Sequence, residues 1–527
     1  MIERYPYASQ RMPVFARNVV ATSQPLAAQA GLGMLQRGGS AVDAAVAAAA
    51  VLTVVQPTGN GLGSDAFAMV WDGAELHGLN GSGRSPGRLD PSRFAGRDAM
   101  PTSGWDAVTV PGAVSAWVAL HERFGRLPLG TVLAPAIAYA RDGFLVSPIT
   151  AALWSRARAT HGQRADFAAA FLPDGRSPAA GSMWRFPEQA RTLEAIAVSR
   201  GERFYRGDVA RAIADHARRE GSVLDERDLA EHAPSWVEPI ALTVDLPDGP
   251  LTLHELPPNG QGIAASVALG LLDHTPIRDC APDDADAAHL QIEAIKQAFD
   301  VVHRHVADPD HLERSSTSLL DPRALRERAA RIDPERASVP AQRWPGSGGT
   351  VYLAAADAGG MMVSFIQSNY MGFGSGVVVP GTGISLQNRA AGFVLDPTHP
   401  NRVGPGKRPF HTIMPGFVTR LGCPTMAFGM TGGPMQPQGH VQLVLRTALW
   451  GQNAQAACDA PRWQVRDGVG VDVERGFAPD VVAELRRRGH DVRVSDTTFG
   501  GAQVVACLHG GYIAASDPRN DGQAVGF

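Results

Sequence analysis

The chain has 527 residues, of which 44% are hydrophobic and 19% are charged, and its formal net charge is −4. A chain of this length and composition can bury a large core, and length alone favours three or four domains. The small negative charge offers no basic surface for nucleic acid or for an anionic membrane. The four cysteines lie far apart without a C-x-x-C pair, which argues against a metal site and a disulfide framework. We therefore expect no metal, no cofactor, no nucleic-acid partner and no membrane partner.

The N-terminal half is rich in alanine and predicts helices. Residues 1–8 have neither a basic stretch before an apolar run nor a small-residue cleavage site, so we expect a cytoplasmic protein. Residues 23–38 predict a helix with proline in its first turn and glycines at its end. Residues 44–55 form the longest apolar run, which is too short to span a bilayer. We expect this run to be a buried helix capped by Ser40 and Asp43.

The segment after this helix predicts a hairpin. Residues 66–71 and 74–79 are strand-like and flank Asp72-Gly73, a dipeptide typical of tight hairpin turns. Helices are expected from there to about residue 300, with one strand near 251–256.

The C-terminal third is expected to begin with a connector and a pair of strands. Residues 321–349 are charged and broken by prolines, which indicates an exposed connector. We expect a strand that begins near Thr350, a turn at 358–360 and a partner strand at 361–367. Thr350 should then lie at an edge of a central sheet.

Thr350 directly follows Gly348 and Gly349. If the chain is cut between Gly349 and Thr350, the threonine hydroxyl becomes a nucleophile and the new α-amino group becomes its base. A free α-amine titrates at about 7.7–8.0 and is partly unprotonated at neutral pH, so one residue supplies both groups. The glycines leave the preceding peptide bond free to take the backbone angles that attack by the side chain requires. Taken alone, this tripeptide also fits an ordinary loop before a strand.

Further motifs occur on both sides of Thr350. They lie at residues 38–47, 56–57, 61–63, 110–113, 133–137, 368–376, 380–384, 387–388, 404–409 and 514–519. In order and spacing they resemble the γ-glutamyltranspeptidase family of N-terminal nucleophile hydrolases, and the resemblance covers nearly the whole chain.

The resemblance implies an α+β fold, the four-layer αββα sandwich of the N-terminal nucleophile hydrolases. It also implies that a precursor is cut before Thr350. Residues 1–349 would be the large subunit and residues 350–527 the small catalytic subunit, both within one domain. The partners are then a small-molecule amide substrate and the chain's own cleaved subunit, in a heterodimer or a dimer of heterodimers.

A competing motif lies at residues 83–87. They match the G-x-S-x-G elbow that carries the nucleophilic serine of α/β-hydrolases. In that elbow the backbone N–H of the residue after the serine helps to bind the oxyanion, and Pro86 has no N–H. A serine hydrolase is therefore disfavoured.

The resemblance assigns catalytic roles to four residues. Thr350 is the nucleophile, and Ser368 stands where the family has a threonine that hydrogen-bonds the nucleophile. Met435 and Gln436 stand at the family's oxyanion hole, where their backbone N–H groups still provide two donors. Tyr370 replaces an asparagine, which narrows the pocket and adds one phenolic hydrogen bond.

The match is weaker where the family holds its substrate. Ser82 occupies the position of an arginine that pairs with the substrate carboxylate. Arg84, two places later, is either the replacement for that arginine or a solvated surface residue. Gly392 stands in place of the acid that holds the α-amino group. His411 and Thr412 replace two serines, and His411 either donates to a substrate carboxylate or is a structural histidine.

These features predict an amide hydrolase that forms an acyl-enzyme on Thr350. γ-Glutamyl amides such as glutathione are the leading expectation, because they are the family's usual substrates. Since the acid for the amine is missing, oxamate or another small carboxy-amide is one alternative, and a glutaryl amide of the cephalosporin type is another. A non-catalytic binding protein is the alternative from a different class.

Overall fold

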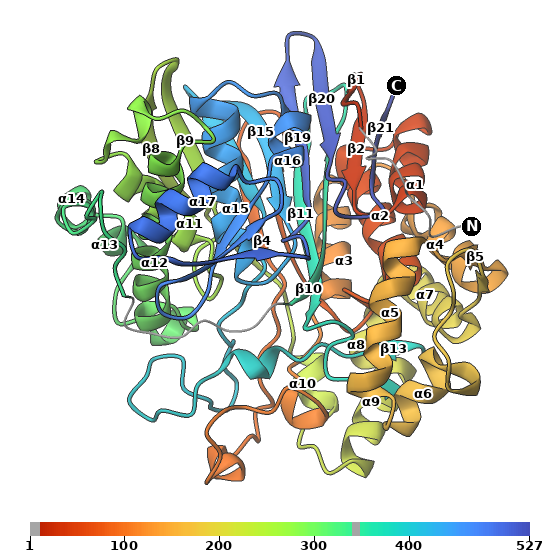
Figure 1. Ribbon diagram of the computed structural model, residues 1–527. Helices are drawn as coiled ribbons and strands as arrows, with labels where there is room; N and C mark the ends of the chain where they lie inside the picture. Colours follow the sequence, from red (N-terminus) through yellow and green to blue (C-terminus); the bar gives the residue numbers. More distant parts are fainter. Residues whose placement is uncertain (1–10, 340–347) are drawn as a thin grey trace.

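The computed structural model describes residues 11–339 and 348–527. It contains two seven-stranded sheets and three small ones, with helices on both sides (Figure 1). The expected fold of mixed helices and strands is confirmed. Two regions interpreted from the sequence, residues 1–8 and the part of the connector at 340–347, lie outside the described residues.

Both large sheets are antiparallel throughout. Sheet 1 has the order β1 (Val14–Ala16), β20 (Gly511–Ser516), β19 (Ala502–Leu508), β15 (Cys423–Met430), β14 (Gly416–Arg420), β9 (Gly249–Glu255) and β8 (Ile240–Leu246). Sheet 2 has the order β21 (Gln523–Gly526), β2 (Val19–Thr22), β10 (Gly349–Ala356), β11 (Met362–Tyr370), β3 (Asp65–Trp71), β4 (Leu76–Asn80) and β7 (Ser235–Val237). Each sheet therefore combines strands from both sides of Thr350.

The small sheets lie outside this pair. They are β5 (Phe144–Leu145) with β6 (Met183–Trp184), β12 (Val378–Val379) with β13 (Ile384–Ser385), and β16 (Trp463–Val465) with β17 (Gly470–Glu474) and β18 (Asp491–Ser495).

Strand β10 is buried on both faces. Tyr352 and Ala354 join an apolar cluster that also contains Phe417 and Val505 of sheet 1. Alternate residues of the same strand, such as Leu353, join a second cluster with the helices beside sheet 2. Because successive strand residues point to opposite faces, an unbroken apolar run is what a strand covered on both sides requires.

Helices cover the outer faces of the two sheets. The cluster beside sheet 2 includes α1 (Pro25–Gln36), α2 (Ala41–Val55), α3 (Ala113–Phe124), α4 (Leu129–Asp142), α5 (Pro148–His161), α7 (Pro187–Ser199), α8 (Glu202–Arg206), α9 (Asp208–Arg219) and α10 (Glu226–Ala230). The cluster beside sheet 1 includes α11 (Ile263–Leu272), α12 (Ala285–His305), α13 (Ser316–Leu319), α14 (Pro322–Ala329), α15 (Met435–Val444), α16 (Ala454–Asp459) and α17 (Pro479–Arg487). Helix α6 (Ala165–Phe171) packs in a smaller aromatic cluster.

The predicted buried helix is α2. Ser40 Oγ accepts a hydrogen bond from Asp43 N at 3.1 Å, and the Asp43 carboxylate accepts one from Ser40 N at 2.9 Å. This reciprocal cap satisfies two backbone donors at the start of the helix. All residues of α2 are buried, which fits a helix that is apolar on every side.

Two expectations about the chain around Thr350 are wrong. Strand β10 lies between β2 and β11 and is not an edge strand. Its pairing with β2 begins only at Leu353, so Thr350 lies beyond the end of β2. The connector is also partly folded, since α14 forms within it and buries Leu325 and Ala329. Asp321 caps α14 and proline occupies its first turn, so the local signals for a helix were present in the charged segment.

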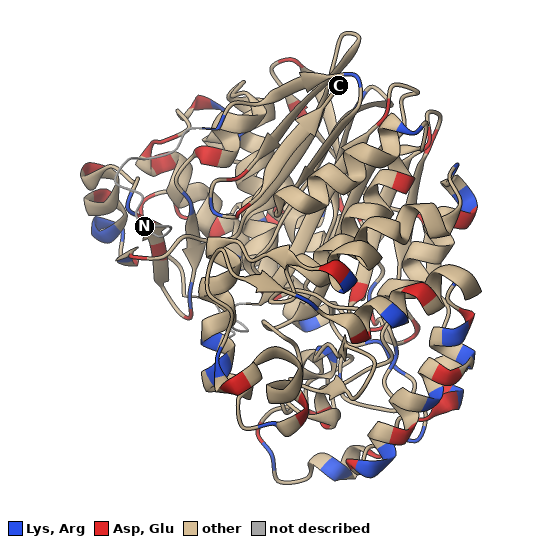
Figure 2. Cartoon of the chain, turned by 90° about the vertical axis from the view of Figure 1, so that its right-hand side faces the viewer, with Lys and Arg blue, Asp and Glu red and all other residues tan. Residues whose placement is uncertain are grey.

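Most charged residues lie on the outside of the molecule. In the view of Figure 2, acidic and basic residues are intermingled along the peripheral helices, while the central strands are almost free of charge. Within residues 11–339 and 348–527, no helix combines the length and the apolar character that crossing a membrane requires.

Candidate active site

Thr350 lies at the N-terminal end of β10 and is 6% exposed. Its Oγ1 donates a hydrogen bond to Ser368 Oγ on the neighbouring strand β11, at 3.2 Å. The register between the strands shifts here: Gly349 is opposite Tyr370, whereas Val351 is opposite Gln367. A bulge of this kind re-aims a side chain and is common next to active sites.

Ser368 connects the hydroxyl of Thr350 to the peptide bond that precedes it. Its Oγ accepts from Thr350 Oγ1 and, at 2.8 Å, from the backbone N–H of Tyr370. The same hydroxyl donates to the carbonyl oxygen of Gly349 at 2.7 Å. Donation to this oxygen polarises the carbonyl whose carbon Thr350 would attack.

The two glycines before Thr350 are tightly packed. A Cβ on Gly348 would lie 2.4 Å from the carbonyl oxygen of Tyr370, and one on Gly349 would lie 2.8 Å from the nitrogen of Gly372. Neither glycine has a positive φ. The structure therefore explains the glycine pair by close packing, whereas the sequence argument attributed it to unusual backbone angles.

A cavity of about 460 Å³ opens beside Thr350. It is bounded by the segment after α2, by α5, by the loop after β11 and by Thr431 at the end of β15. A Cβ on Gly59, in the first of these segments, would lie 3.2 Å from the nitrogen of Thr350. Glycine at position 59 thus leaves room for an α-amino group at Thr350.

Removing the Ser368 hydroxyl should slow the cut before Thr350. Ser368→Ala deletes both the acceptor for Thr350 Oγ1 and the donor to the Gly349 carbonyl. Loss of one such donor costs about 100- to 1,000-fold in rate, so we expect the half-time of cleavage to lengthen by about that factor. The measurement is the fraction of full-length chain on a denaturing gel against time after synthesis in vitro.

Ser364→Ala is the matched control for this experiment. Ser364 lies on the same strand, is equally buried, and hydrogen-bonds the hydroxyl of Tyr352 at 2.7 Å. It touches neither Thr350 nor Gly349, so cleavage should proceed at the wild-type rate. Equal rates for Ser368→Ala and the wild type would remove Ser368 from the site.

The two predicted oxyanion donors are already engaged. Met435 N–H donates to the carbonyl of Gly432, and Gln436 N–H donates to the carbonyl of Gly433, both at 3.1 Å. These bonds close the first turn of α15. An N–H group that already donates to a carbonyl is a weaker donor to an oxyanion, and this geometry argues against Met435 and Gln436 in that role.

Arg84 is also engaged elsewhere. Its Nη1 donates to the carboxylate of Asp308 and to the carbonyl of Gly406, both at 2.9 Å. Asp308 is fully buried, so the arginine balances its charge. Arg84 is therefore a half-exposed cation whose charge is paired with that of Asp308.

His411 forms a buried pair with Asp65. Its Nε2 lies 3.1 Å from Asp65 Oδ2, and its Nδ1 accepts from the backbone N–H of Ile413 at 3.3 Å. Burial, followed by the charges of Arg389 and Arg408, lowers the pKa of His411 well below its usual value. The imidazole is thus neutral, with its Nε2–H directed at Asp65. Of the two interpretations of His411, this geometry favours the structural one.

Thr412 and Tyr370 both contact a residue that the sequence interpretation missed. Thr412 Oγ1 accepts a hydrogen bond from Arg389 Nη1 at 2.8 Å. The guanidinium of Arg389 also lies over the ring of Tyr370, 4.6 Å from its centroid. An arginine within the otherwise apolar segment 389–394 was a signal that could have been used.

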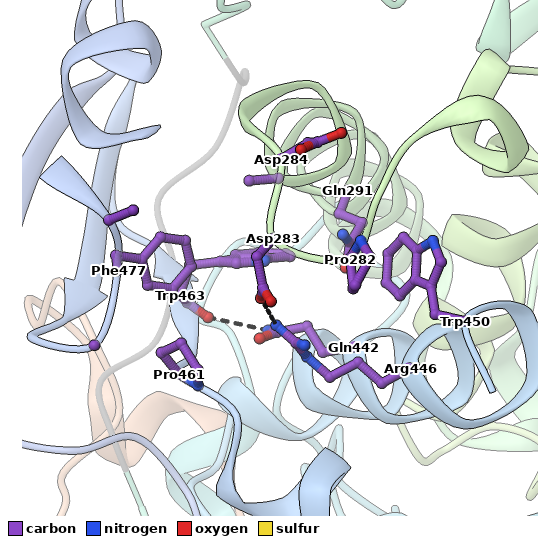
Figure 3. Close-up of a pocket in the computed structure, with 13 residues that line it drawn as sticks. Pro282, Asp283, Asp284, Gln291, Gln442, Arg446, Trp450, Pro461, Trp463 and Phe477 are labelled. Carbon is purple, nitrogen blue, oxygen red and sulfur yellow. Dashed lines mark hydrogen bonds and ion pairs between the residues drawn. The ribbon is translucent and has the colours of Figure 1, made fainter. Parts of the chain in front are cut away.

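A second cavity, of about 310 Å³, lies between α12, α15 and the start of β16. Figure 3 shows Arg446 and Asp283 directed at each other across it, and their closest N and O atoms are 2.8 Å apart. None of the sequence-predicted site residues lines this cavity. The residues that suit nucleophilic catalysis are gathered at Thr350 instead.

Comparisons with known proteins show the family of the chain. Over residues 27–527 the chain matches the family described as Gamma-glutamyltranspeptidase. It is 37% identical to the oxamate amidohydrolase proenzyme of Klebsiella pneumoniae subsp. pneumoniae, with 95% of this chain and 97% of that protein covered. It is 34% identical to the glutathione hydrolase-like YwrD proenzyme of Bacillus subtilis, with 97% and 98% covered.

The chain also matches a solved structure over its whole length. The cephalosporin acylase from Bacillus halodurans superposes with a TM-score of 0.94 at 46% identity, over 100% of this chain and 98% of that one. The match thus extends over the whole chain and both large sheets. The chain belongs to the gamma-glutamyltranspeptidase family, and it is an amide hydrolase of that family.

Proposed function

We propose that this protein is a self-processing hydrolase that cuts itself between Gly349 and Thr350 and then uses Thr350 as an N-terminal nucleophile. The observation that carries the proposal is the Ser368 hydroxyl, which bridges Thr350 Oγ1 and the Gly349 carbonyl. The proenzyme names of the relatives support a cut of this kind.

The fold proposed for this activity is the four-layer αββα sandwich. Its support is the alternation of apolar clusters: helices against sheet 2, sheet 2 against sheet 1, and sheet 1 against the second group of helices. Residues 1–349 and 350–527 would stay together after the cut, as a heterodimer, because both pieces supply strands to both sheets.

Processing follows from the bonds around Thr350. Its Oγ1 attacks the carbonyl carbon of Gly349, and the C–N bond to Thr350 breaks as the nitrogen takes up the hydroxyl proton. The product is an ester between Gly349 and Thr350 Oγ1. Water hydrolyses this ester and leaves a carboxylate on Gly349 and a free amine on Thr350.

In turnover the free amine acts as the base. It accepts the proton of Thr350 Oγ1 as the oxygen attacks the substrate amide, and it returns that proton to the departing amine. Water then resolves the acyl-enzyme by the same route. The cavity beside Thr350 gives the substrate access to Oγ1.

Gly432 and Gly433 are the proposed oxyanion donors in place of Met435 and Gln436. Within the described part of the chain, neither glycine N–H donates a hydrogen bond. Both glycines have positive φ, 114° and 60°, directly before α15. They follow Thr431, which lines the cavity with Thr350. Backbone N–H groups held in this way are suited to the charge that develops on a tetrahedral intermediate.

The acyl group is proposed to be a small acid without an α-amine. A Cβ on Gly392 would lie 2.4 Å from the carbonyl oxygen of Phe410, so an acid cannot enter this position without displacing backbone. Gly392 and Tyr370 line a cavity of about 300 Å³ whose described lining includes no acidic residue. The lack of an acid in this lining favours oxamate and glutaryl amides over γ-glutamyl amides as substrates.

The test compares matched substrates with and without the amine. We expect kcat/KM for glutaryl p-nitroanilide to lie within about a hundredfold of that for the γ-glutamyl compound, because no buried acid is left unpaired by the glutaryl group. The value of kcat/KM is also measured for oxamate and for glutathione. A preference for the amine above about a hundredfold, roughly 2.7 kcal/mol, would show that another carboxylate binds it.

A further inference from the structure

Arg389 is a buried cation with unused hydrogen-bond donors. It lies on the short 3-10 helix η6 (Arg389–Gly392) and is 1% exposed. Nη1 donates to Thr412 Oγ1 at 2.8 Å, but Nε and Nη2 have no hydrogen-bond partner among the described residues. Leaving charged donors unpaired in the interior is costly, so such a group indicates a site for a ligand.

The two free nitrogens form one edge of the guanidinium. Nε–H and Nη2–H point in the same direction, and this edge matches the two oxygens of a carboxylate. Nη1, on the other side, is held by Thr412, and the guanidinium plane is held over the ring of Tyr370 at 4.6 Å. The fork is therefore fixed in orientation before any ligand arrives, which lowers the entropic cost of binding.

No acid within the described residues neutralises this fork directly. Asp65 interacts with it electrostatically, but no ion pair between them lies within 4.0 Å. Asp65 instead contacts His411 and accepts from Gly112 N at 3.1 Å. Burial raises the pKa of Asp65 to about 7, and Arg389 opposes the rise. The positive charge of Arg389 is thus only partly neutralised by Asp65, and a bound anion would neutralise the rest.

Arg389 is connected to the nucleophile through Tyr370. The backbone N–H of Tyr370 donates to Ser368 Oγ, which in turn accepts from Thr350 Oγ1. Tyr370 thus contacts Arg389 through its ring and the Ser368–Thr350 pair through its backbone N–H. Arg84, the residue expected to hold that carboxylate, is occupied by Asp308.

We propose that the Nε–Nη2 edge of Arg389 binds the carboxylate of the acyl group, so that the enzyme is selective for amides of short acids that carry a second, anionic carboxylate. This inference rests on the proposed function and names its substrate class. It moves the anionic subsite from the loop of Arg84 to the buried guanidinium beside Tyr370.

The kinetic test uses Arg389→Gln and two substrates. Glutaryl p-nitroanilide carries the carboxylate, and butyryl p-nitroanilide has a similar length without it. For the glutaryl compound we expect kcat/KM to fall by about a hundredfold or more, mainly through KM. For the butyryl compound we expect a change of less than about threefold. An equal loss on both substrates, or no loss on either, would overturn the assignment.

Arg408→Gln is the matched control. Arg408 is a second buried arginine near Asp65, but its Nε donates to Ser82 O at 3.1 Å and its Nη2 donates to Ser235 Oγ at 3.0 Å. Its donors are used within the protein. This variant should lose stability without changing the ratio between the two substrates, and a selective loss on the glutaryl compound would contradict the role given to Arg389.

A binding measurement separates this inference from the proposed function. Glutarate should raise the Tm of the wild-type protein, whereas glutaramide at the same concentration should not, and Arg389→Gln should remove the shift. If no amide is hydrolysed but glutarate binds through Arg389, the function fails and the subsite stands. If amides are hydrolysed and the wild type shows neither a glutarate shift nor a preference for the glutaryl anilide, the subsite fails and the function stands. The wild-type comparisons decide the matter even where the variant does not fold.

Discussion

Replacing Thr350 by alanine should leave the chain in one piece and abolish amide hydrolysis. The alanine methyl group supplies neither the nucleophile for the Gly349 carbonyl nor, without a cut, a free α-amine as base. In hydrolases where loss of the nucleophile has been measured, kcat falls on the order of 10⁶-fold, and we expect a loss of that size. Wild-type protein should instead give two bands on a denaturing gel, and N-terminal sequencing of the smaller one should read Thr-Val-Tyr.

Thr350→Ser provides the control for this substitution. It keeps a hydroxyl at the same position, so the chain should still be cut, and the piece should begin Ser-Val-Tyr. An alanine variant that is cut like the wild type would place the proteolytic nucleophile elsewhere. Wild-type protein that remains full length and yet hydrolyses amides would contradict the proposed mechanism.

Local signals were sufficient to predict many of the elements from sequence. Helix α2 has a reciprocal cap and apolar residues throughout, and both features act within a few residues of chain. The hairpin of β3 and β4 was predicted from its Asp-Gly dipeptide, although the loop runs over four residues, 72–75, because Trp71 pairs with Leu76. Because local hydrogen bonds specify these two elements, they could be predicted without knowledge of the tertiary contacts.

The candidate site depends on contacts between distant segments, which the sequence patterns did not include. Arg84 forms an ion pair with Asp308, which lies more than 200 residues later in the sequence. No local pattern predicts such a pair. Met435 and Gln436 were chosen by position within a motif, but the hydrogen bonds of the first turn of α15 use their N–H groups. The start of a helix changes which donors are free, and sequence spacing alone does not fix that start.

Arg389 and Gly392 belong to the same short helix and support one interpretation. Gly392 has no room for an acid, because of the carbonyl of Phe410. Arg389 places a cation with a free edge nearby. The site thus lacks an acid to bind an amine and has a guanidinium to bind a carboxylate. Both features favour an acyl group with an anionic end and no ammonium group.

Replacing Asp517 by alanine should destabilise the C-terminal piece strongly. Asp517 is fully buried and pairs with two buried arginines, Arg462 and Arg519, the second at 3.1 Å. Its removal leaves Arg462 without its ion-pair partner and Arg519 with Glu474 alone. Breaking a buried pair of this kind costs about 3–5 kcal/mol. The measurement is urea unfolding in the Thr350→Ala background, where a single chain avoids dissociation of the two pieces.

Acid should weaken the same network in the wild-type protein. Burial acts to raise the pKa of Asp517, but Arg462 and Arg519 outweigh it, so the net pKa lies below the usual value. A carboxylate with a lowered pKa stabilises the fold above its unfolded pKa of about 3.9, and this contribution is lost as the pH falls below that value. The alanine variant lacks the group and should lose less stability over the same range.

Asp496→Ala is the control for both experiments. It breaks an ion pair between Asp496, whose side chain is 83% exposed, and Arg475, whose side chain is 75% exposed. This variant should change stability little at any pH. Equal effects of Asp517→Ala and Asp496→Ala would contradict the role given to the buried network.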